Sequence, residues 1–188
     1  TGLDALKGAE ILKTAADSYT STIEYAETGI AQSLRGMAQV IFKGLGTRVL
    51  YTSQGGYDTH ASQVSVQTPL LSDLSAGIGD FFADLSEHDA ADNVMMLVFT
   101  EFGRRVKDNG SGSDHGSGGG CYLIGQPVKG GTLGDYPSLK EEDQLDGDLH
   151  FNVDFRSVYS TIVDKWLGLD AQTAIGGNYE TLDFVRSN

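Results

Sequence analysis

Acids and imidazoles gather at a few places in this sequence, in types and spacings that suit metal binding. Asp58 and His60 follow a pair of glycines, and Asp114 and His115 stand side by side in a glycine-rich stretch. Glu101 comes just after an apolar run. Carboxylates and imidazoles are the side chains that bind zinc, manganese, calcium or magnesium in proteins. We therefore take these five residues as candidate ligands of a divalent metal ion.

Each pair also has an ordinary structural interpretation. Asp58 and His60 are two positions apart, so an extended chain points both to the same side. Asp58 can equally cap the next helix, with His60 as a solvated loop residue. In the same way, Asp114 and His115 can be a turn acid beside an exposed imidazole. Spacing alone leaves both alternatives open.

A cationic residue stands close to the remaining acid. Arg104 follows Glu101 by three positions, and it either fixes an anionic substrate oxygen or pairs with Glu101. We take Glu101 as a ligand or a base and Arg104 as an anion clamp, which makes both candidate catalytic residues. Several serines and threonines lie near the acids, but none stands in a G-x-S-x-G motif, so a serine–histidine–acid triad has little support.

Short strand-forming runs border these residues, at positions 47–52, 94–99 and 121–124. The second run (VMMLVF) is unbroken and apolar, which is typical of a strand buried on both faces of a parallel sheet. Cys121 opens the third run, and we interpret it as a small buried hydrophobe. Open α/β sheets bind ligands at the carboxyl ends of their strands. The candidate ligands are therefore expected to meet at one edge of a sheet and to hold one or two cations.

Helical periodicity marks the segments between these runs. The pattern predicts helices over residues 3–25, 30–45, 69–87 and 153–167. Gly44 and Gly46 are placed to end the second helix, Asp154 to cap the last one, and Trp166 to lie in the core. The alternation of helices with strands predicts one α/β domain over residues 1–188.

Overall composition excludes some classes of protein. The chain has 188 residues and a formal net charge of −13. We predict no nucleic-acid partner, because the sequence offers no basic stripe to neutralise phosphates. We also predict no membrane span, because no apolar run approaches about 20 residues.

Several motifs in this order resemble the bacterial "domain of unknown function 1501" family. They are GGYDTH at 55–60, TEFGRR at 100–105, SDHG at 113–116, VKGG at 128–131, and DFRSVYSTIVDKWLGLD at 154–170. The family is placed in the alkaline phosphatase and sulfatase superfamily. The resemblance implies a three-layer α/β sandwich with a mostly parallel central sheet and a metal-centred site.

The resemblance also implies residue roles and an activity. Asp58 and His60 look like one ligand pair, and Asp114 and His115 look like later ligands. Glu101 stands where superfamily members often carry an Asp-His pair. The implied activity is metal-dependent hydrolysis of small anionic phosphate or sulfate esters.

Family members are usually about twice as long, carry an export signal and keep the superfamily's nucleophile in an N-terminal half. The resemblance therefore implies a periplasmic or extracellular protein. It also suggests the C-terminal part of a longer chain, which associates with a missing N-terminal segment or a partner chain. The alternative is a secreted structural or binding protein that keeps the alkaline phosphatase-like fold without its chemistry.

Overall fold

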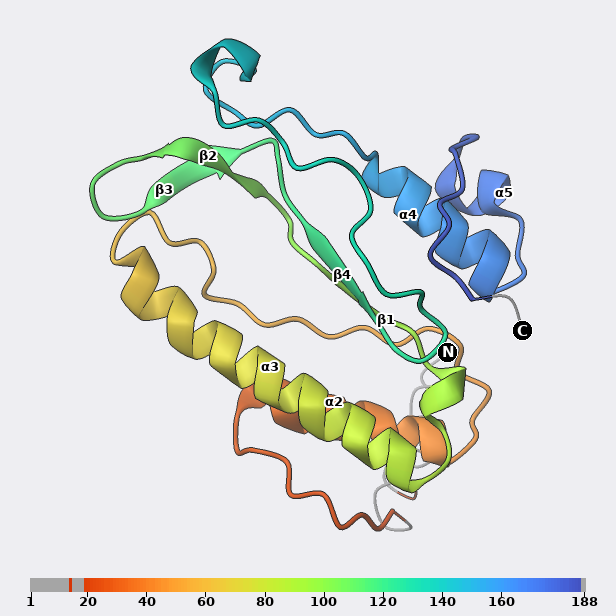
Figure 1. Ribbon diagram of the computed structural model, residues 1–188. Coiled ribbons are helices and arrows are strands. Elements are labelled where there is room, and N and C mark those ends of the chain that lie inside the picture. The colour runs from red at the N-terminus through yellow and green to blue at the C-terminus, as the bar shows by residue number, and fades with distance from the viewer. Residues whose placement is uncertain (1–13, 15–18, 187–188) are drawn as a thin grey trace, which may run out of the picture. The chain divides into compact units, whose positions relative to one another are not determined.

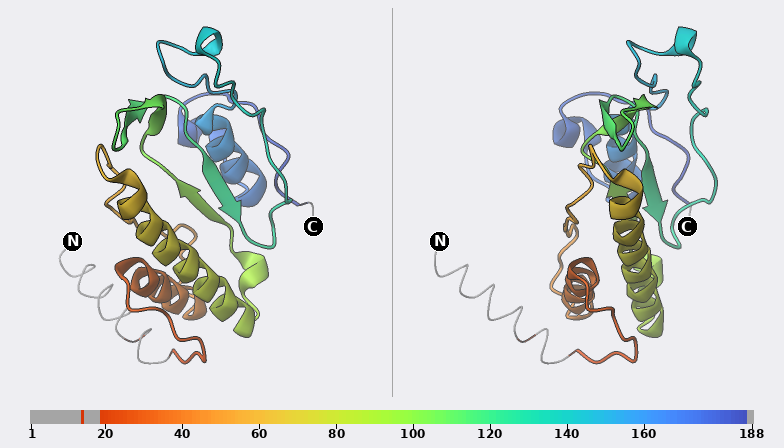
Figure 2. Two further views of the ribbon diagram at one scale, coloured as in Figure 1. Left: turned by 60° about the vertical axis from the view of Figure 1, so that its left-hand side comes forward. Right: turned by 90° about the vertical axis from the view of Figure 1, so that its left-hand side faces the viewer.

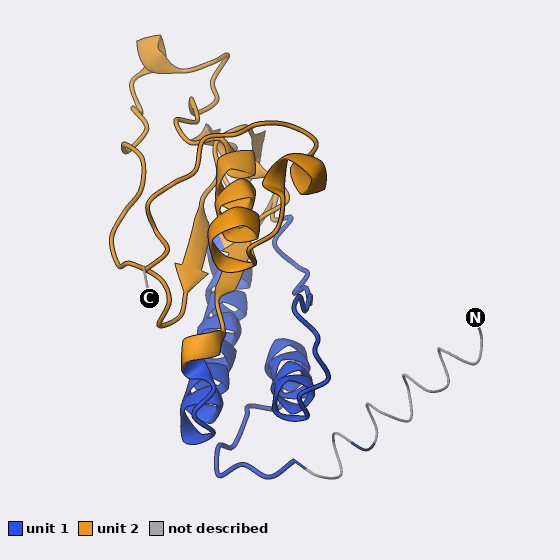
Figure 3. Cartoon of the chain, turned by 90° about the vertical axis from the view of Figure 1, so that its right-hand side faces the viewer, with its two compact units in different colours: residues 1–58, 64–91 blue, residues 59–63, 92–188 orange. Residues whose placement is uncertain are grey.

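The computed structural model describes residue 14 and residues 19–186, so most of the helix predicted over 3–25 lies outside the described residues. Residues 19–25 are described and are not helical. The chain forms two compact units, coloured separately in Figure 3. The first comprises Thr1–Asp58 and Val64–Ala91, and the second comprises Thr59–Gln63 and Asp92–Asn188.

The first unit is built on two helices, α2 (Gly29–Phe42) and α3 (Gln63–Glu87), which run side by side in Figure 2. They approach closely at Gly77, where an added Cβ would lie 3.3 Å from Ala31 Cα. Their facing apolar side chains, together with Tyr25 from the chain before α2, form the core of this unit: Ile30, Ala31, Leu34, Ala38, Phe81 and Leu85. Burial of such a stripe is the main source of stability for an amphipathic helix pair.

The two predicted helices in this unit are confirmed, with shifted ends. α2 begins after its N-cap Thr28, whose hydroxyl accepts from the Ala31 amide, and it stops before Gly44, whose φ is +65°. α3 starts at Gln63, six residues before the predicted start at Pro69. The hydrophobic stripe marks the body of the helix, but its polar first turns carry no such signal.

The strand predicted over residues 47–52 is wrong. The chain there has no regular secondary structure, and the side chains of Val49 and Tyr51 are 70% and 74% exposed. β-branched and aromatic residues favour a strand only where a neighbouring strand supplies hydrogen bonds and a packing surface.

The second unit contains a long β arm, visible in Figure 1. β1 (Met96–Phe99) leads into β2 (Gly103–Asp108), and β3 (Ser113–Gly116) leads back into β4 (Cys121–Ile124). β1 pairs with β4 and β2 pairs with β3, and both pairs are antiparallel. The arm is therefore one reversal of the chain, with β2 and β3 nearer its tip.

This arrangement overturns the predicted three-layer sandwich with a mostly parallel sheet. The described residues form two separate two-stranded antiparallel sheets instead. The strands at 94–99 and 121–124 do exist, but the hairpin of β2 and β3 rather than a crossover helix connects them, and only a crossover makes neighbouring strands parallel. Accordingly, β1 is only partly buried, and Cys121 is exposed rather than a core residue.

The predicted C-terminal helix is present in two parts. Asp154 caps α4 (Phe155–Thr161) as expected, accepting from the Arg156 amide at 2.9 Å, and a π-helical turn (Ile162–Trp166) follows. Trp166 is only half-buried, so its predicted core position is wrong. Instead, Tyr159 of α4 packs edge-on against Phe99 of β1, with ring centres 6.1 Å apart.

The remaining elements are short. They are α5 (Ala171–Ile175) and two 3₁₀ turns at Ala91–Asn93 and Glu141–Asp143. Near the end of the chain, Phe184 is buried, and its carbonyl accepts from the Lys129 amide at 2.8 Å. Among the described residues, no helix is both long and apolar enough to cross a membrane.

Candidate metal centre

A tight turn between β2 and β3 positions the candidate ligands. The Asn109 side-chain oxygen accepts from the amides of Ser111 (3.2 Å) and Gly112 (2.9 Å), and the Asn109 amide donates to the Gly112 carbonyl at 2.9 Å. Gly110 has φ of +96°, a conformation that glycine adopts without strain. These local bonds hold the start of β3 in one conformation.

The segment Thr59–Gln63 lies against this turn. The Ser62 amide donates to the Ser111 hydroxyl at 2.8 Å, and the Gln63 amide donates to the Ser111 carbonyl at 3.1 Å. The Ser113 hydroxyl donates to the Gln63 side chain at 2.9 Å. Residues about 50 positions apart in the sequence are thereby held together on one side of the hairpin.

Gly112 makes this close approach sterically feasible. A Cβ at position 112 would lie 2.5 Å from the Thr59 carbonyl oxygen and 2.6 Å from the His60 carbonyl carbon. Both neighbours are backbone atoms, so no side-chain rotation can relieve the contact. A glycine here is therefore required for the backbone that carries His60 to lie against the hairpin.

His60 and Asp114 form a direct pair. His60 Nδ1 lies 3.0 Å from Asp114 Oδ1, and Asn109 Nδ2 donates to the His60 carbonyl at 3.0 Å and to Asp114 Oδ1 at 3.4 Å. An ionised carboxylate only accepts hydrogen bonds, so Nδ1 of His60 carries the proton. In the neutral ring the other nitrogen, Nε2, then carries the lone pair, and this is the form that binds a metal.

The same contact affects the acid. The hydrogen bond from His60, and secondarily that from Asn109, lowers the pKa of Asp114 below its ordinary value. Both side chains are well exposed, 49% for His60 and 59% for Asp114, so solvent screens the attraction. Asp114 therefore stays ionised at neutral pH and orients the imidazole.

His115 is fixed by aromatic contacts. It faces Arg104 of β2 in the strand register, and its ring stacks on Phe102 at 3.7 Å between centres with 12° between planes. The ring of His60 lies 5.0 Å away. Stacking on Phe102 restricts the orientation of the His115 imidazole and keeps the two histidines close together.

Three of the predicted ligands come together. Asp58, His60 and His115 each offer one ligand atom, and these atoms lie within 4.8 Å of one another. Asp58 is the residue at which the chain passes from the first unit to the second, one peptide bond before Thr59. We call Asp58, His60 and His115 the ligand cluster, and all three residues are exposed.

The other predicted site residues take different positions. Asp114 contacts His60 and is not in the ligand cluster. Glu101 is exposed in the bend between β1 and β2, and it is also outside the cluster. Arg104 donates to the Ser113 carbonyl and, at 3.4 Å, to the Thr59 hydroxyl. The guanidinium thus ties the hairpin to the segment that carries His60.

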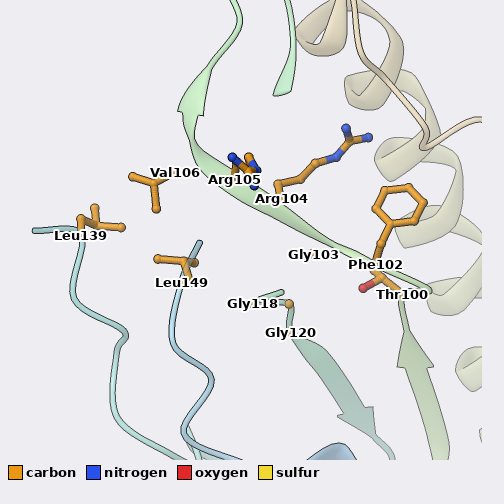
Figure 4. A pocket seen from close by; sticks show the side chains of 11 residues that line it. Thr100, Phe102, Gly103, Arg104, Arg105, Val106, Gly118, Gly120, Leu139 and Leu149 are labelled. Carbon is orange, nitrogen blue, oxygen red and sulfur yellow. The ribbon is translucent and has the colours of Figure 1, made fainter. Parts of the chain in front are cut away.

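An open pocket of about 450 Å³ lies beside β2 and is shown in Figure 4. Its walls include the Gly118–Gly120 backbone and the side chains of Leu139 and Leu149, and no residue of the ligand cluster lines it. In Figure 4, Phe102 and Arg104 extend to the side of β2 opposite these two leucines. The pocket is therefore adjacent to the cluster but separate from it.

Asp114 is expected to contribute to metal binding through His60 rather than as a ligand. We predict that Asp114→Ala lowers the affinity for zinc by about 10- to 100-fold, the usual effect of losing a carboxylate that orients a ligating histidine. Titration calorimetry with zinc measures this change. Asp135→Ala, which removes an exposed acid from the polar loop after β4, is the matched control and is expected to bind zinc normally. Unchanged affinity in Asp114→Ala would contradict the assigned role.

The sequence-based prediction missed several residues that build the site. Asn109, Gly112 and Phe102 position the histidines without being ligands themselves. The Asn109-Gly110 pair, flanked by strand-length segments, is a strong hairpin signal that identifies the turn. No local pattern identifies Gly112 or Phe102, because their roles depend on contacts with distant segments.

Comparison with known proteins identifies the family of the chain. The model of a family described as "Protein of unknown function (DUF1501)" matches residues 13–180, which is most of the sequence. No curated protein matches the chain, and no solved structure matches it. The match confirms the family that the motifs indicated, and the chain belongs to the DUF1501 family of proteins of unknown function.

Proposed function

We propose that the protein is a metal-dependent hydrolase of phosphate or sulfate esters, or the metal-binding part of one. The observation that carries this proposal is the ligand cluster, in which Asp58, His60 and His115 each bring a ligand atom to within 4.8 Å of the others. Three ligands from the protein leave coordination positions for water or substrate, as catalytic metal sites do.

The donor set fits one divalent ion. Two imidazole nitrogens and one carboxylate oxygen suit zinc or manganese better than calcium or magnesium, which prefer oxygen ligands. The pairing of His60 with Asp114 adds the carboxylate–histidine arrangement that commonly supports such ligands. When bound, such an ion supplies Lewis acidity and lowers the pKa of a coordinated water to about 7.

The nature of the substrate rests on the motif resemblance. The proposal includes membership of the alkaline phosphatase and sulfatase superfamily. In that case the substrate is a small anionic ester, and the protein works in the periplasm or outside the cell. In this proposal Glu101 acts as a base. Arg104 clamps the anion. To do so, its guanidinium would give up the hydrogen bond to the Thr59 hydroxyl and donate to the ester instead.

A non-catalytic metal-binding role is the alternative, and the observed contacts of Arg104 favour it. The guanidinium donates to the Ser113 carbonyl and stands over the Phe102 ring at 5.0 Å. An arginine held in this way stabilises the hairpin next to the histidines. In this alternative the metal fastens Thr59–Gln63 to the hairpin, and the protein serves as a secreted structural or binding component.

Metal loading followed by an assay separates these functions. We expect the full chain loaded with zinc or manganese to hydrolyse an aryl phosphate or an aryl sulfate, with activity lost on chelation and restored by the metal. Activity must also fall to background in His115→Ala, while His150→Ala, which changes an exposed histidine outside the cluster, keeps it. Stoichiometric metal without turnover would support the non-catalytic role, and absence of metal binding would overturn both.

A further inference from the structure

His88, just beyond the end of α3, places both ring nitrogens against hydrogen-bond acceptors. Nδ1 lies 2.9 Å from the Asp84 carbonyl oxygen, and Nε2 lies 2.9 Å from the Thr20 carbonyl oxygen. A carbonyl oxygen cannot donate, and a neutral imidazole has only one N–H group. Both bonds can therefore form only when His88 is a doubly protonated imidazolium.

A buried acid compensates this charge. The Asp84 carboxylate is fully buried, and its Oδ1 lies 3.2 Å from His88 Nδ1. Its other oxygen accepts from the hydroxyls of Tyr25, at 2.8 Å, and Tyr19. A buried carboxylate is costly without partners, and the two hydroxyls stabilise its charged form. The negative charge of Asp84 in turn favours a positive charge on His88.

The remaining neighbours hold the same segment of chain. The carboxylate of Glu87 accepts from the Thr22 amide at 3.0 Å and from the Thr22 hydroxyl at 2.6 Å. Phe42 of α2 stacks on the His88 ring at 4.1 Å and carries no charge. From the same helix, Arg35 lies 5.9 Å from the centre of the Tyr19 ring.

We propose that His88 is a pH-sensitive clamp, which in its charged form fastens residues 19–25 to the end of α3 and in its neutral form holds them less tightly. The imidazolium joins Thr20 to Asp84 across 64 positions of the chain, all within the first unit. Deprotonation removes one of the two N–H donors. Because a neutral ring cannot satisfy both carbonyls, one end of this connection must then open.

The direction of the pH effect follows from the surroundings. The hydrogen bond to the Asp84 carbonyl raises the pKa of His88 above its ordinary value, partly offset by desolvation. A raised histidine pKa means that the clamp is complete at acidic pH and is lost as the pH rises through that folded-state pKa. The pKa of Tyr19 is raised to about 12 by burial, and that of Glu87 is lowered by its bonds to Thr22. Of these three groups, therefore, only His88 combines an ordinary pKa near neutrality with a shift toward higher pH.

Nuclear magnetic resonance of the full chain tests the clamp. At pH 6 we expect both ring nitrogens of His88 to carry protons, with a pKa above the ordinary value for histidine. Hydrogen exchange gives a second measurement, the protection factor of the Thr22 amide. Between pH 6 and pH 9 this factor is expected to fall roughly fivefold, the effect of losing about one hydrogen bond.

Two variants complete the experiment. In His88→Gln the protection of the Thr22 amide should not depend on pH, whereas His150→Gln should behave as the natural sequence does. A His88 that carries a single ring proton at pH 6 would overturn the proposal, even if the glutamine variant fails to fold. So would Thr22 protection that stays constant with pH in the natural sequence, or that falls equally in His88→Gln.

Discussion

Replacing His115 by alanine is expected to lower zinc affinity by more than about 100-fold, beyond the effect typical of an outer-shell partner. The substitution removes one of two imidazoles in the ligand cluster and leaves His60 and a single carboxylate. Two remaining ligands on an exposed surface hold a divalent ion poorly, because water competes for every vacated position. Titration calorimetry of the natural sequence and the variant measures the loss directly.

The comparison needs two controls, because His115 also packs against another ring. Phe102→Leu removes the stacking partner at 3.7 Å but keeps both histidines, so its zinc affinity should fall much less. His150→Ala controls for loss of an exposed histidine elsewhere. If His115→Ala binds zinc as tightly as His150→Ala does, the ligand cluster is not a metal site, and the proposed hydrolase loses its basis.

Replacing Gly112 by alanine is expected to disturb the site without touching any ligand. The new methyl group would stand 2.5 Å from the Thr59 carbonyl oxygen, closer than such contacts occur in folded proteins. Either Thr59–Gln63 or the turn must move, which breaks the bonds from Ser62 and Gln63 to Ser111. We expect a loss of about 1–3 kcal/mol in the free energy of unfolding, the usual cost of overpacking. Zinc affinity should fall with it, because His60 moves away from His115.

Gly120→Ala is the matched control for this experiment. It is the same substitution in the same glycine-rich stretch, but an added Cβ at Gly120 has no atom within 4 Å. Chemical denaturation and zinc titration of the two variants give both quantities. Equal stability and equal affinity for Gly112→Ala and Gly120→Ala would show that the close approach at Thr59 does not support the site.

The sequence alone was sufficient to predict those elements whose structure depends on residues close by in the chain. The periodic apolar residues of α2 and α3 mark both helices, and the side chain of Asp154 caps α4 as its type and position predict. The two strand-length apolar runs become β1 and β4. Helical propensity, capping and alternation act over a few residues, so a short window of sequence contains the information.

The candidate site was predicted in part for the same reason. Residue type and spacing are sufficient to select Asp58, His60 and His115 as candidate ligands, and the structure brings them together. Residue type and spacing do not distinguish a ligand from a residue that orients a ligand. Asp114 stands next to His115 in the sequence, yet it contacts His60, 54 positions away.

Only the tertiary structure decided the pairing of strands and the roles of individual contacts. The apolar run at 94–99 is compatible with a parallel or an antiparallel neighbour, and the turn at Asn109 made the neighbour antiparallel. Residues 47–52 have strand-forming side chains, but no regular structure forms there. The need for glycine at position 112 likewise arises only where Thr59 meets the hairpin. These outcomes depend on which distant segments meet, and that is set by the balance of packing and loop closure over the whole chain rather than by local preference.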